Sequence, residues 1–452
     1  MAAMRTGRPV KLAYSRQQMF SIAGYRTPTV SRIRLAAERD GTLTAVSHEA
    51  FEQTSTVQEF AEQTAEGTRH LYATPNLFTT HSLAALDVPT PRWMRAPGEA
   101  PGVFALESAM DELAIALDMD PIELRIRNDA EVDPEKGLPF SSRNLVGCFR
   151  RGAELFGWRQ RGAAPTMRRD GRFLVGTGVA TATYPAMAQP SSARVTALPD
   201  GTFAVGVNAA DIGTGARTVM LQIAADALRV PLERVRIAVG DSDLPTASVA
   251  GGSSGTASWG WAVTKAATAV LRRLAAGEPI PEGGLSAVEA TDDDLKARGE
   301  YSRNAYGAHF VEVRVDRDSG EVEIPRMVGV FAAGRIMNPR TARSQFLGGM
   351  TMGIGMALTE VGELDPLFGD YANHDFATYH IPVSADVRSL TVDWLEEDDE
   401  HLTPMGNKGI GEIGIVGAAA AIGNAVRDAT GVRLRRLPIQ PDALIAALPQ
   451  RA

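Results

Sequence analysis

Three β-hairpin patterns separated by helical stretches constrain the fold of this chain more than any other feature of its sequence. Each pattern consists of two runs that alternate polar and apolar residues around a tight turn; the three patterns span 29–53, 193–213 and 308–334. Their turns are predicted at Asp40-Gly41, Asp200-Gly201 and Ser319-Gly320. Antiparallel hairpins mixed with helices predict an α+β architecture rather than regular βαβ winding.

Helical patterns separate these hairpins. Leucine and methionine recur at helical spacing after Pro101, which predicts an amphipathic helix that ends before Pro121. Further helices are predicted at 216–228 and at roughly 341–359, with Thr341 as the N-cap of the second. The acidic, glycine- and proline-rich segment 275–300 is expected to be a solvated loop.

Length and composition limit the class of protein. A chain of 452 residues exceeds the usual size of a single core, so at least two domains are expected. A net charge of −8 argues against nucleic acid as the main partner. The single cysteine, Cys148, excludes a disulfide framework and a thiolate cluster for iron–sulfur or zinc ligation. A proline-, glycine- and arginine-rich stretch from about Asp133 to Arg172 is predicted to be a linker region with one short helix around Cys148.

No apolar run of about 18 residues occurs, so no membrane span is expected. The basic start of the chain lacks the apolar stretch of a secretory signal. A cytoplasmic location is therefore expected, or a periplasmic one if a partner subunit carries an export signal.

A glycine motif near the end of the chain raises the main functional question. In "KGIGEIGIVGAAAAIGNAV" (408–426), Gly409, Gly411 and Gly414 spell GxGxxG, the outline of a dinucleotide-binding loop. That motif needs a buried strand before it, whereas the preceding residues are polar, and Glu412 would repel a phosphate. A nicotinamide or flavin site is therefore disfavoured. Glu412 is either an exposed residue at a glycine-rich helix start, or a carboxylate held at a helix N-terminus beside a bound cofactor.

The segment "GGSSG" (251–255) fits the nucleophile elbow of serine hydrolases, but proline and small residues precede it instead of a buried strand. It is better interpreted as a loop that donates N–H and O–H groups to an anionic ligand. "DIGTG" (211–215) and "GRIMNPRTARSQ" (334–345) are further glycine turns before helices, and Arg95 lies in another turn, "WMRAPGEAPG". Together these turns suggest a large anionic cofactor that is bound mainly by backbone groups.

Four segments in this order, "WMRAPGEAPGVFALESAMDELA", "DIGTGARTVMLQIAADAL", "GRIMNPRTARSQ" and "KGIGEIGIVGAAAAIGNAV", resemble the molybdenum-binding subunit of the xanthine dehydrogenase/aldehyde oxidoreductase family. The resemblance covers essentially the whole chain. The forms "RAPGEAPG" and "DIGTG" are most similar to the bacterial aldehyde dehydrogenase branch, whose cofactor is molybdopterin cytosine dinucleotide.

The resemblance implies roles for individual residues. Glu412 matches the family's catalytic glutamate, a general base beside the molybdenum, which is itself held through the pterin rather than by protein ligands. The positions that match cofactor contacts are Arg95, Ala96, Gly213, Thr214, Gly251, Gly252, Ser253, Ser254, Thr256, Arg335, Ile336, Met337, Asn338, Pro339, Arg340, Thr341, Gln345, Lys408, Gly409, Ile410 and Gly411. Thr214 departs from the pattern, because many relatives carry glutamine there.

The resemblance also implies an activity, oxidation of aldehydes or N-heterocycles, and partners, an iron–sulfur subunit and an FAD subunit that take the electrons. It implies a partial first molybdopterin-binding domain at 1–145, a linker at 146–172 and a second such domain at 173–452. The family's hammerhead-like domain and "GGGFGGK" loop have no counterpart here, so the chain matches only the later portion of the subunit. Two alternatives are an inactive remnant and a split half that needs a separate N-terminal polypeptide.

Overall fold

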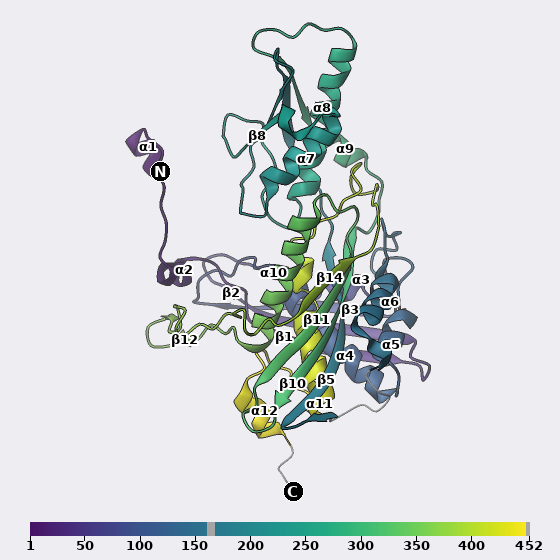
Figure 1. The fold of residues 1–452 in the computed structure, drawn as a ribbon. Helices are drawn as coiled ribbons and strands as arrows, with labels where there is room; N and C mark the ends of the chain where they lie inside the picture. The colour runs from purple at the N-terminus through teal and green to yellow at the C-terminus, as the bar shows by residue number, and fades with distance from the viewer. Residues whose placement is uncertain (161–167, 449–452) are drawn as a thin grey trace.

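The protein is built around two hydrophobic cores, as a computed structural model that describes residues 1–160 and 168–448 shows. The larger core draws side chains from Leu43 to Leu444, and the smaller one draws most of its side chains from 193–285. In Figure 1 the smaller core forms the teal body at the top, and the long strands of the larger core run below it. The larger core includes side chains on both sides of 146–172, and the domain boundaries given above stay a prediction.

A five-stranded sheet forms the centre of the larger core. Its order is β14-β11-β10-β5-β4, with β14 parallel to β11 and the other pairs antiparallel. The strands are β4 (Arg168–Asp170), β5 (Phe173–Pro185), β10 (Asn304–Asp316), β11 (Val322–Ala332) and β14 (Leu390–Trp394). Strands β10 and β11 confirm the hairpin predicted at 308–334 and its turn.

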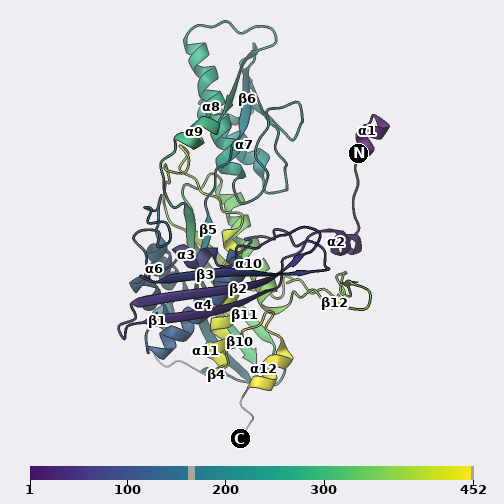
Figure 2. The same ribbon diagram turned by 180° about the vertical axis from the view of Figure 1, so that it is seen from behind.

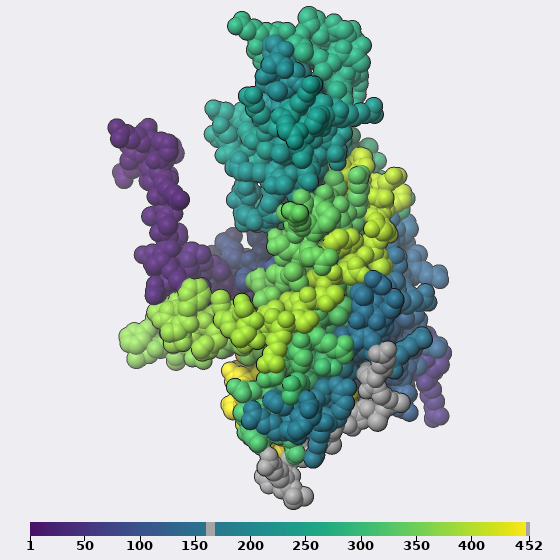
Figure 3. Space-filling model, in the orientation of Figure 1, coloured from purple at the N-terminus to yellow at the C-terminus, as the bar shows by residue number. Residues whose placement is uncertain are grey.

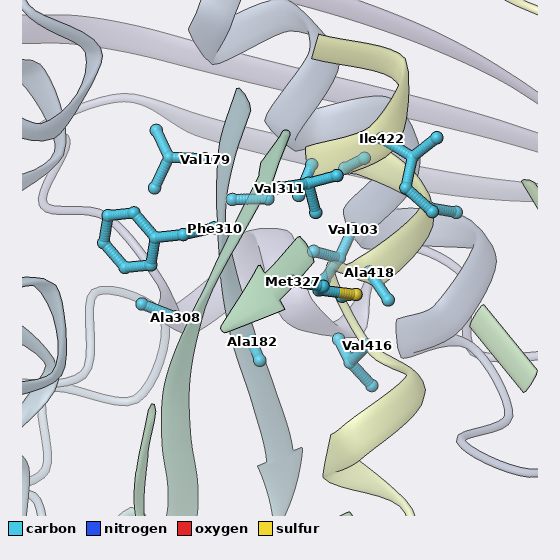
Figure 4. Close-up of a cluster of buried hydrophobic side chains, with 14 of the residues drawn as sticks. Val103, Val179, Ala182, Ala308, Phe310, Val311, Met327, Val416, Ala418 and Ile422 are labelled. Carbon is cyan, nitrogen blue, oxygen red and sulfur yellow. The ribbon is translucent and has the colours of Figure 1, made fainter. Parts of the chain in front are cut away.

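Helices cover both faces of this sheet. Helix α11 (Ala418–Thr430) lies so close to β5 that a Cβ atom on Gly178 would stand 2.1 Å from the Ala421 carbonyl oxygen. Helix α6 (Leu145–Phe156), the short helix predicted around Cys148, covers the opposite face, where Gly152 meets the Phe310 ring. Figure 4 shows part of the resulting cluster of buried apolar side chains. Glycine at these contacts allows helix and strand to approach closely.

A three-stranded sheet forms the next layer. It contains β1 (Thr29–Ala37), β2 (Leu43–Ser55) and β3 (Leu77–Leu86). The first two pair as the hairpin predicted around Asp40-Gly41, and β3 runs parallel to β2. Figure 2 shows these strands crossing the molecule on the side opposite to that of Figure 1. The predicted amphipathic helix is α4 (Glu99–Ala116), which contacts β1, β5 and α11. Two short helices, α3 (Glu66–His70) and α5 (Pro121–Arg127), complete this part.

The smaller core lies in a segment inserted between β5 and β10. Its sheet has the order β8-β7-β6-β9, formed by β6 (Ser192–Ala197), β7 (Phe203–Val207), β8 (Val235–Val239) and β9 (Leu285–Ala290). Helices α7 (Ala216–Leu228) and α8 (Gly255–Ala275) pack against it, and α7 has the bounds predicted for it. The hairpin around Asp200-Gly201 is confirmed.

The prediction that 275–300 is only a solvated loop is wrong, because the segment contains β9 and α9 (Asp292–Ala297). Strand β9 pairs with β6 and buries Leu285. The three aspartates that indicated a solvated loop occupy the first turn of α9, where negative charge stabilises a helix.

The long predicted helix is α10 (Pro339–Leu358), but its N-cap is Asn338 and not Thr341. The Asn338 side chain accepts hydrogen bonds from the backbone N–H groups of Arg340 and Thr341. Proline suits the first helical position, since its missing N–H has no partner there in any helix. The helix therefore begins two residues earlier than expected.

Two segments project from the body on the same side. One carries α1 (Ala2–Thr6) and α2 (Arg16–Ile22), and the other carries β12 (Leu364–Asp365) and β13 (Asp370–Tyr371) (Figure 3). They meet where Phe20 packs edge-on against Tyr371 and Tyr379. The last described element, α12 (Pro441–Ala447), packs near the turn between β10 and β11, where Pro441 faces Gly320. Within 1–160 and 168–448 no helix is both long and apolar enough to cross a bilayer.

Candidate functional site

A cavity of about 960 Å³ opens where the two cores meet. Its walls include Val219 and Trp259 of the smaller core and Ala342 of the larger one. Seven stretches of chain that are distant in sequence supply the lining: 63–66, 93–99, 184–189, 212–219, 249–259, 335–345 and 407–412. The glycine-rich turns that the sequence singled out therefore converge on one space.

Most of the predicted site residues border this cavity. They are Arg95, Thr214, Gly251, Gly252, Ser253, Ser254, Thr256, Arg335, Ile336, Met337, Asn338, Thr341, Gln345, Lys408, Gly409, Ile410, Gly411 and Glu412. Ala96, Gly213, Pro339 and Arg340 are adjacent in sequence to lining residues but are not part of the lining. Their roles toward a cofactor stay predictions.

Glu412 is held by two donors from different segments. The backbone N–H of Ala96 donates to its Oε1 at 3.3 Å, and the Ser253 hydroxyl donates to its Oε2 at 3.1 Å. A carboxylate accepts up to about four hydrogen bonds, so each oxygen keeps acceptor capacity on the cavity side. Glu412 precedes a short 3₁₀ turn (Ile413–Ile415), and α11 begins only at Ala418. Glu412 therefore stands at the N-terminus of this 3₁₀ turn and not at that of α11.

The glycines around Glu412 allow two loops to touch. A Cβ atom on Gly409 would lie 2.2 Å from the Ser253 carbonyl oxygen, and one on Gly411 would lie 3.2 Å from the Ser253 Oγ. The spacing that resembles a dinucleotide loop thus serves close packing of 408–412 on the 251–255 loop. No strand of the described chain leads directly into Gly409, which removes the context that a nicotinamide site requires.

Arg95 fixes the same loop from the other side. Its Nε donates to the Gly411 carbonyl at 2.6 Å, and its Nη2 donates to the Gln345 carbonyl at 2.8 Å. Burial lowers the pKa of the guanidinium, and the nearby Glu412 carboxylate opposes this effect. The side chain therefore ties the loop to α10, in addition to the role predicted for its backbone.

Lys408 stabilises the site through a buried network of charged side chains. Its buried ammonium lies 3.3 Å from Glu397 and 3.7 Å from Asp399, and it also donates to the Ser142 carbonyl. Glu397 in turn accepts a hydrogen bond from the Gly334 N–H at 3.1 Å. This network joins the loop before α10 to the Glu412 loop. Because the charge of Lys408 is engaged there, any contact with a cofactor would come from its backbone.

Sequence reasoning missed three titratable residues of the lining: Glu66 at the start of α3, Glu99 at the start of α4 and Tyr184 at the end of β5. Burial raises the pKa of Glu99 well above its ordinary range, and the carboxylates of Glu66 and Glu412 add to the effect. Burial, the carboxylates of Glu412 and Glu99, and a hydrogen bond from the Tyr184 hydroxyl to Glu412 also raise the pKa of Tyr184. A carboxylate between Gly98 and Pro101 was a visible signal for Glu99, whereas nothing in the apolar run of β5 marks Tyr184.

The lining fits a large anionic group. Most of the lining is apolar, but its polar part includes hydroxyls, amides and the glycine-rich loops, and Arg335 adds positive charge. The Asn407 Nδ2, which is buried in this lining, has no hydrogen-bond partner in the described structure, and a Cβ atom on Gly213 would meet nothing within 4 Å. The described residues bring no three histidine, cysteine, aspartate or glutamate side chains together as a metal-ligand set. A metal in this cavity would therefore need ligands from a cofactor.

Comparison with protein families gives two matches, both described as a molybdopterin cofactor-binding domain. One covers residues 151–388 and the other covers residues 1–129. Both matches agree with the resemblance drawn from the glycine-rich segments. They also confirm that the mixed helix-and-sheet fold consists of molybdopterin-binding domains.

Among curated proteins, the chain is similar to the aldehyde oxidoreductase molybdenum-binding subunit PaoC of Escherichia coli, with 41% identity over 99% of this chain and 65% of that protein. It is 30% identical to the putative xanthine dehydrogenase molybdenum-binding subunit XdhA of Escherichia coli, over 98% of this chain and 66% of that protein. Among solved structures, the aldehyde oxidoreductase of Desulfovibrio desulfuricans superimposes with a TM-score of 0.86 at 27% identity, over 99% of this chain and 52% of that one. The chain thus spans about two thirds of the length of these curated relatives.

Proposed function

The chain belongs to the molybdenum-binding subunits of the xanthine dehydrogenase/aldehyde oxidoreductase family, and on this premise we propose that it oxidises aldehydes by water-derived hydroxylation at a molybdopterin cofactor. The overall reaction converts an aldehyde and water into a carboxylic acid, two electrons and two protons. The bound cofactor would supply the activation of water and the acceptance of the electron pair.

The position of Glu412 is the observation that carries the proposal. Its carboxylate borders the cavity, is held by one donor on each oxygen, and retains lone pairs that can accept a proton. A general base needs this combination of fixed geometry and free acceptor capacity. Water must lose a proton when its oxygen is transferred to the aldehyde, so a fixed carboxylate beside the reacting atoms has a defined task.

Other residues would bind the cofactor and shape the substrate space. Gln345, Asn407 and the N–H groups of the 251–255 loop are suited to bind the pterin and its phosphate, and the 335–341 segment the dinucleotide end. The cytosine dinucleotide form follows from the resemblance to the aldehyde-oxidising branch.

Trp93 and Met94 line the cavity while remaining exposed, which places apolar surface at its mouth. An aldehyde is favoured over an N-heterocycle because the relative at 41% identity is an aldehyde oxidoreductase, whereas the xanthine dehydrogenase relative stands at 30%.

Electrons must leave through partner subunits in this proposal. Cys148 is the single cysteine, and burial raises the pKa of its thiol, so the chain has no thiolate set for an iron–sulfur cluster. An iron–sulfur subunit and an FAD subunit are the proposed acceptors. The proposed location is the cytoplasm, or the periplasm if a partner directs export.

A second candidate is an inactive remnant, a chain that keeps the family fold but lacks a working site. Glu412 and its donors border the cavity, so the geometry supports the enzyme better.

Purification from the native host with every co-purifying polypeptide separates these candidates. Molybdenum and pterin near one per chain, together with aldehyde oxidation coupled to an artificial electron acceptor, support the enzyme. Aldehyde and hypoxanthine are compared as substrates at equal concentration. A chain that carries neither molybdenum nor pterin would support the inactive remnant.

A further inference from the structure

The two residues that hold Glu412 share an uncommon backbone conformation. Four non-glycine residues of the described chain have positive φ: Ala96, Asp118, Arg229 and Ser253. Ala96 and Ser253, both at φ 54°, also donate to the Glu412 carboxylate, one to each oxygen. Left-handed backbone is disfavoured at a non-glycine residue, and such strain concentrates at functional sites.

Ser253 is the more informative of the two. It follows Gly252, which also has a positive φ of 60°, so two successive residues adopt the left-handed conformation. Glycine is the residue that this conformation favours, and glycine occupies the two preceding positions, 251 and 252. The serine side chain offsets the strain through its hydroxyl, which donates to Glu412 Oε2 at 3.1 Å.

The loop opposite leaves Ser253 little freedom. A Cβ atom on Gly409 would lie 2.6 Å from the Ser253 Cβ, so the two backbones are already in close contact. The Ser253 hydroxyl and the Ala96 N–H thus approach Glu412 from two separate segments and restrain different oxygens. A carboxylate with one donor on each oxygen cannot rotate about its terminal bond without losing a hydrogen bond.

We propose that Ser253 is a positioning residue that orients the Glu412 carboxylate, with the cost of its left-handed backbone offset by this hydrogen bond. The inference rests on the proposed function for its catalytic consequence, but the contact itself can be tested without turnover. Three titratable groups face Glu412: Arg95 before α4, Glu99 on α4 and Tyr184 at the end of β5.

The first test uses thermal unfolding of the purified holoprotein. Ser253→Ala keeps the strained backbone and removes the hydroxyl, whereas Ser253→Gly removes the hydroxyl and relieves the strain. The melting temperature is expected to fall by a few degrees in Ser253→Ala and to fall less in Ser253→Gly. In a Glu412→Ala background the change Ser253→Ala should have no further effect. Ser21→Ala is the matched control, since its hydroxyl also donates to a carboxylate, that of Asp370, but at an exposed position far from the cavity.

The second test uses the loaded enzyme. Turnover of an aldehyde should fall about tenfold in both Ser253→Ala and Ser253→Gly, with unchanged molybdenum content and little change in KM. The acid limb of the pH–rate profile should move to higher pH, because a hydroxyl donated to a carboxylate favours its charged form. If Ser253 had a purely structural role, the acid limb of the pH–rate profile would not move.

Two results overturn the inference. One is a loss of melting temperature on Ser253→Ala that is equally large with and without the Glu412 carboxylate. The other is an unchanged pH–rate profile in a variant that turns over more slowly. If the loaded wild-type protein oxidises no aldehyde, the proposed function fails, and the unfolding experiment still decides whether Ser253 restrains Glu412.

Discussion

The Arg95 guanidinium donates to the Gly411 carbonyl at 2.6 Å across 316 residues of sequence, and the next residue, Ala96, donates its N–H to Glu412 across the same separation. One turn before α4 thus fixes both the loop that carries the glutamate and the glutamate itself. The position of the Glu412 loop depends on these contacts with Arg95, so a change at Arg95 should affect cofactor retention and activity together.

Arg95→Lys should lower cofactor content and activity more than an arginine-to-lysine change at the surface. Arginine reaches the Gly411 and Gln345 carbonyls with two nitrogens, and a lysine ammonium cannot reproduce that fork. We expect the molybdenum content and the aldehyde turnover of the purified variant both to decrease several-fold. Arg34→Lys, at an exposed position on β1, is the control and should change neither quantity. Full cofactor content in Arg95→Lys would show that the two carbonyl contacts are dispensable.

Gly409→Ala should prevent the two glycine-rich loops from packing. The new Cβ would stand 2.2 Å from a backbone oxygen, a contact that only a shift of one loop can relieve. A decrease in bound pterin and in melting temperature is expected, measured by fluorescence of the extracted pterin and by calorimetry. Gly283→Ala, where a Cβ meets nothing within 4 Å, makes the same chemical change without a clash. Equal behaviour of the two variants would contradict this explanation.

How much of this could be predicted from the sequence depends on whether the signal was local. Tight turns such as Asp40-Gly41 and the helical propensity of 216–228 (α7) act within a few residues, so both elements were predicted correctly. The parallel pairing of β3 with β2 and the long central strand β5 depend on partners far away in sequence. In β5, Gly176 and Gly178 weaken the strand pattern because α11 needs that space, so the requirement is visible only in the packed structure.

The residues of the site also divide into those with a local sequence signal and those whose place depends on distant contacts. Glycine turns indicated which segments would form it, and the resemblance to a family indicated Glu412. Tyr184 carried no local signal, because its place in the cavity follows from where β5 ends. The side-chain roles of Arg95 and Lys408 were also beyond sequence reasoning, since both depend on contacts with distant residues.

Breaking the buried ion pair between Glu107 of α4 and Arg125 of α5 should strongly destabilise the protein. Arg125 and Glu107 are fully buried, with 2.7 Å between Arg125 Nε and Glu107 Oε2. Arg125→Met would leave the Glu107 carboxylate buried without its counter-charge, which we expect to cost about 3–5 kcal/mol of unfolding free energy. Denaturant unfolding measures this cost. Arg127→Met, two residues away and exposed, should leave the free energy almost unchanged, and a similar loss in both variants would contradict the assigned role of burial.

Stability should decrease at mildly acidic pH. Burial lowers the pKa of His48 from its ordinary value of 6.5 to about 4, and the nearby His81 and Arg69 add to the effect. Below pH 6.5 the unfolded chain binds a proton at His48, whereas the folded chain does so only when the pH approaches 4. The stability that neutral His48 contributes is therefore fully present above pH 6.5 and is lost as the pH falls toward 4. The resulting loss of unfolding free energy is about 3 kcal/mol for His48.

His48→Gln removes the titration while keeping groups that can hydrogen-bond to Thr68 and Ser31. The plot of unfolding free energy against pH should then be flatter between pH 6.5 and 4 than in the wild type. A variant with an unchanged slope would show that His48 does not titrate in this range.

The most direct measurement of the central claim compares wild type and Glu412→Gln, each purified with its co-purifying polypeptides, for molybdenum, pterin and aldehyde oxidation. The amide keeps the size of the side chain and can still accept from one of the two donors, but it cannot take a proton at neutral pH. The account predicts equal molybdenum and pterin content in both proteins and loss of turnover in the variant by at least about a thousandfold. Wild-type turnover in Glu412→Gln, or loss of molybdenum from it, would contradict the assignment of Glu412 as the general base.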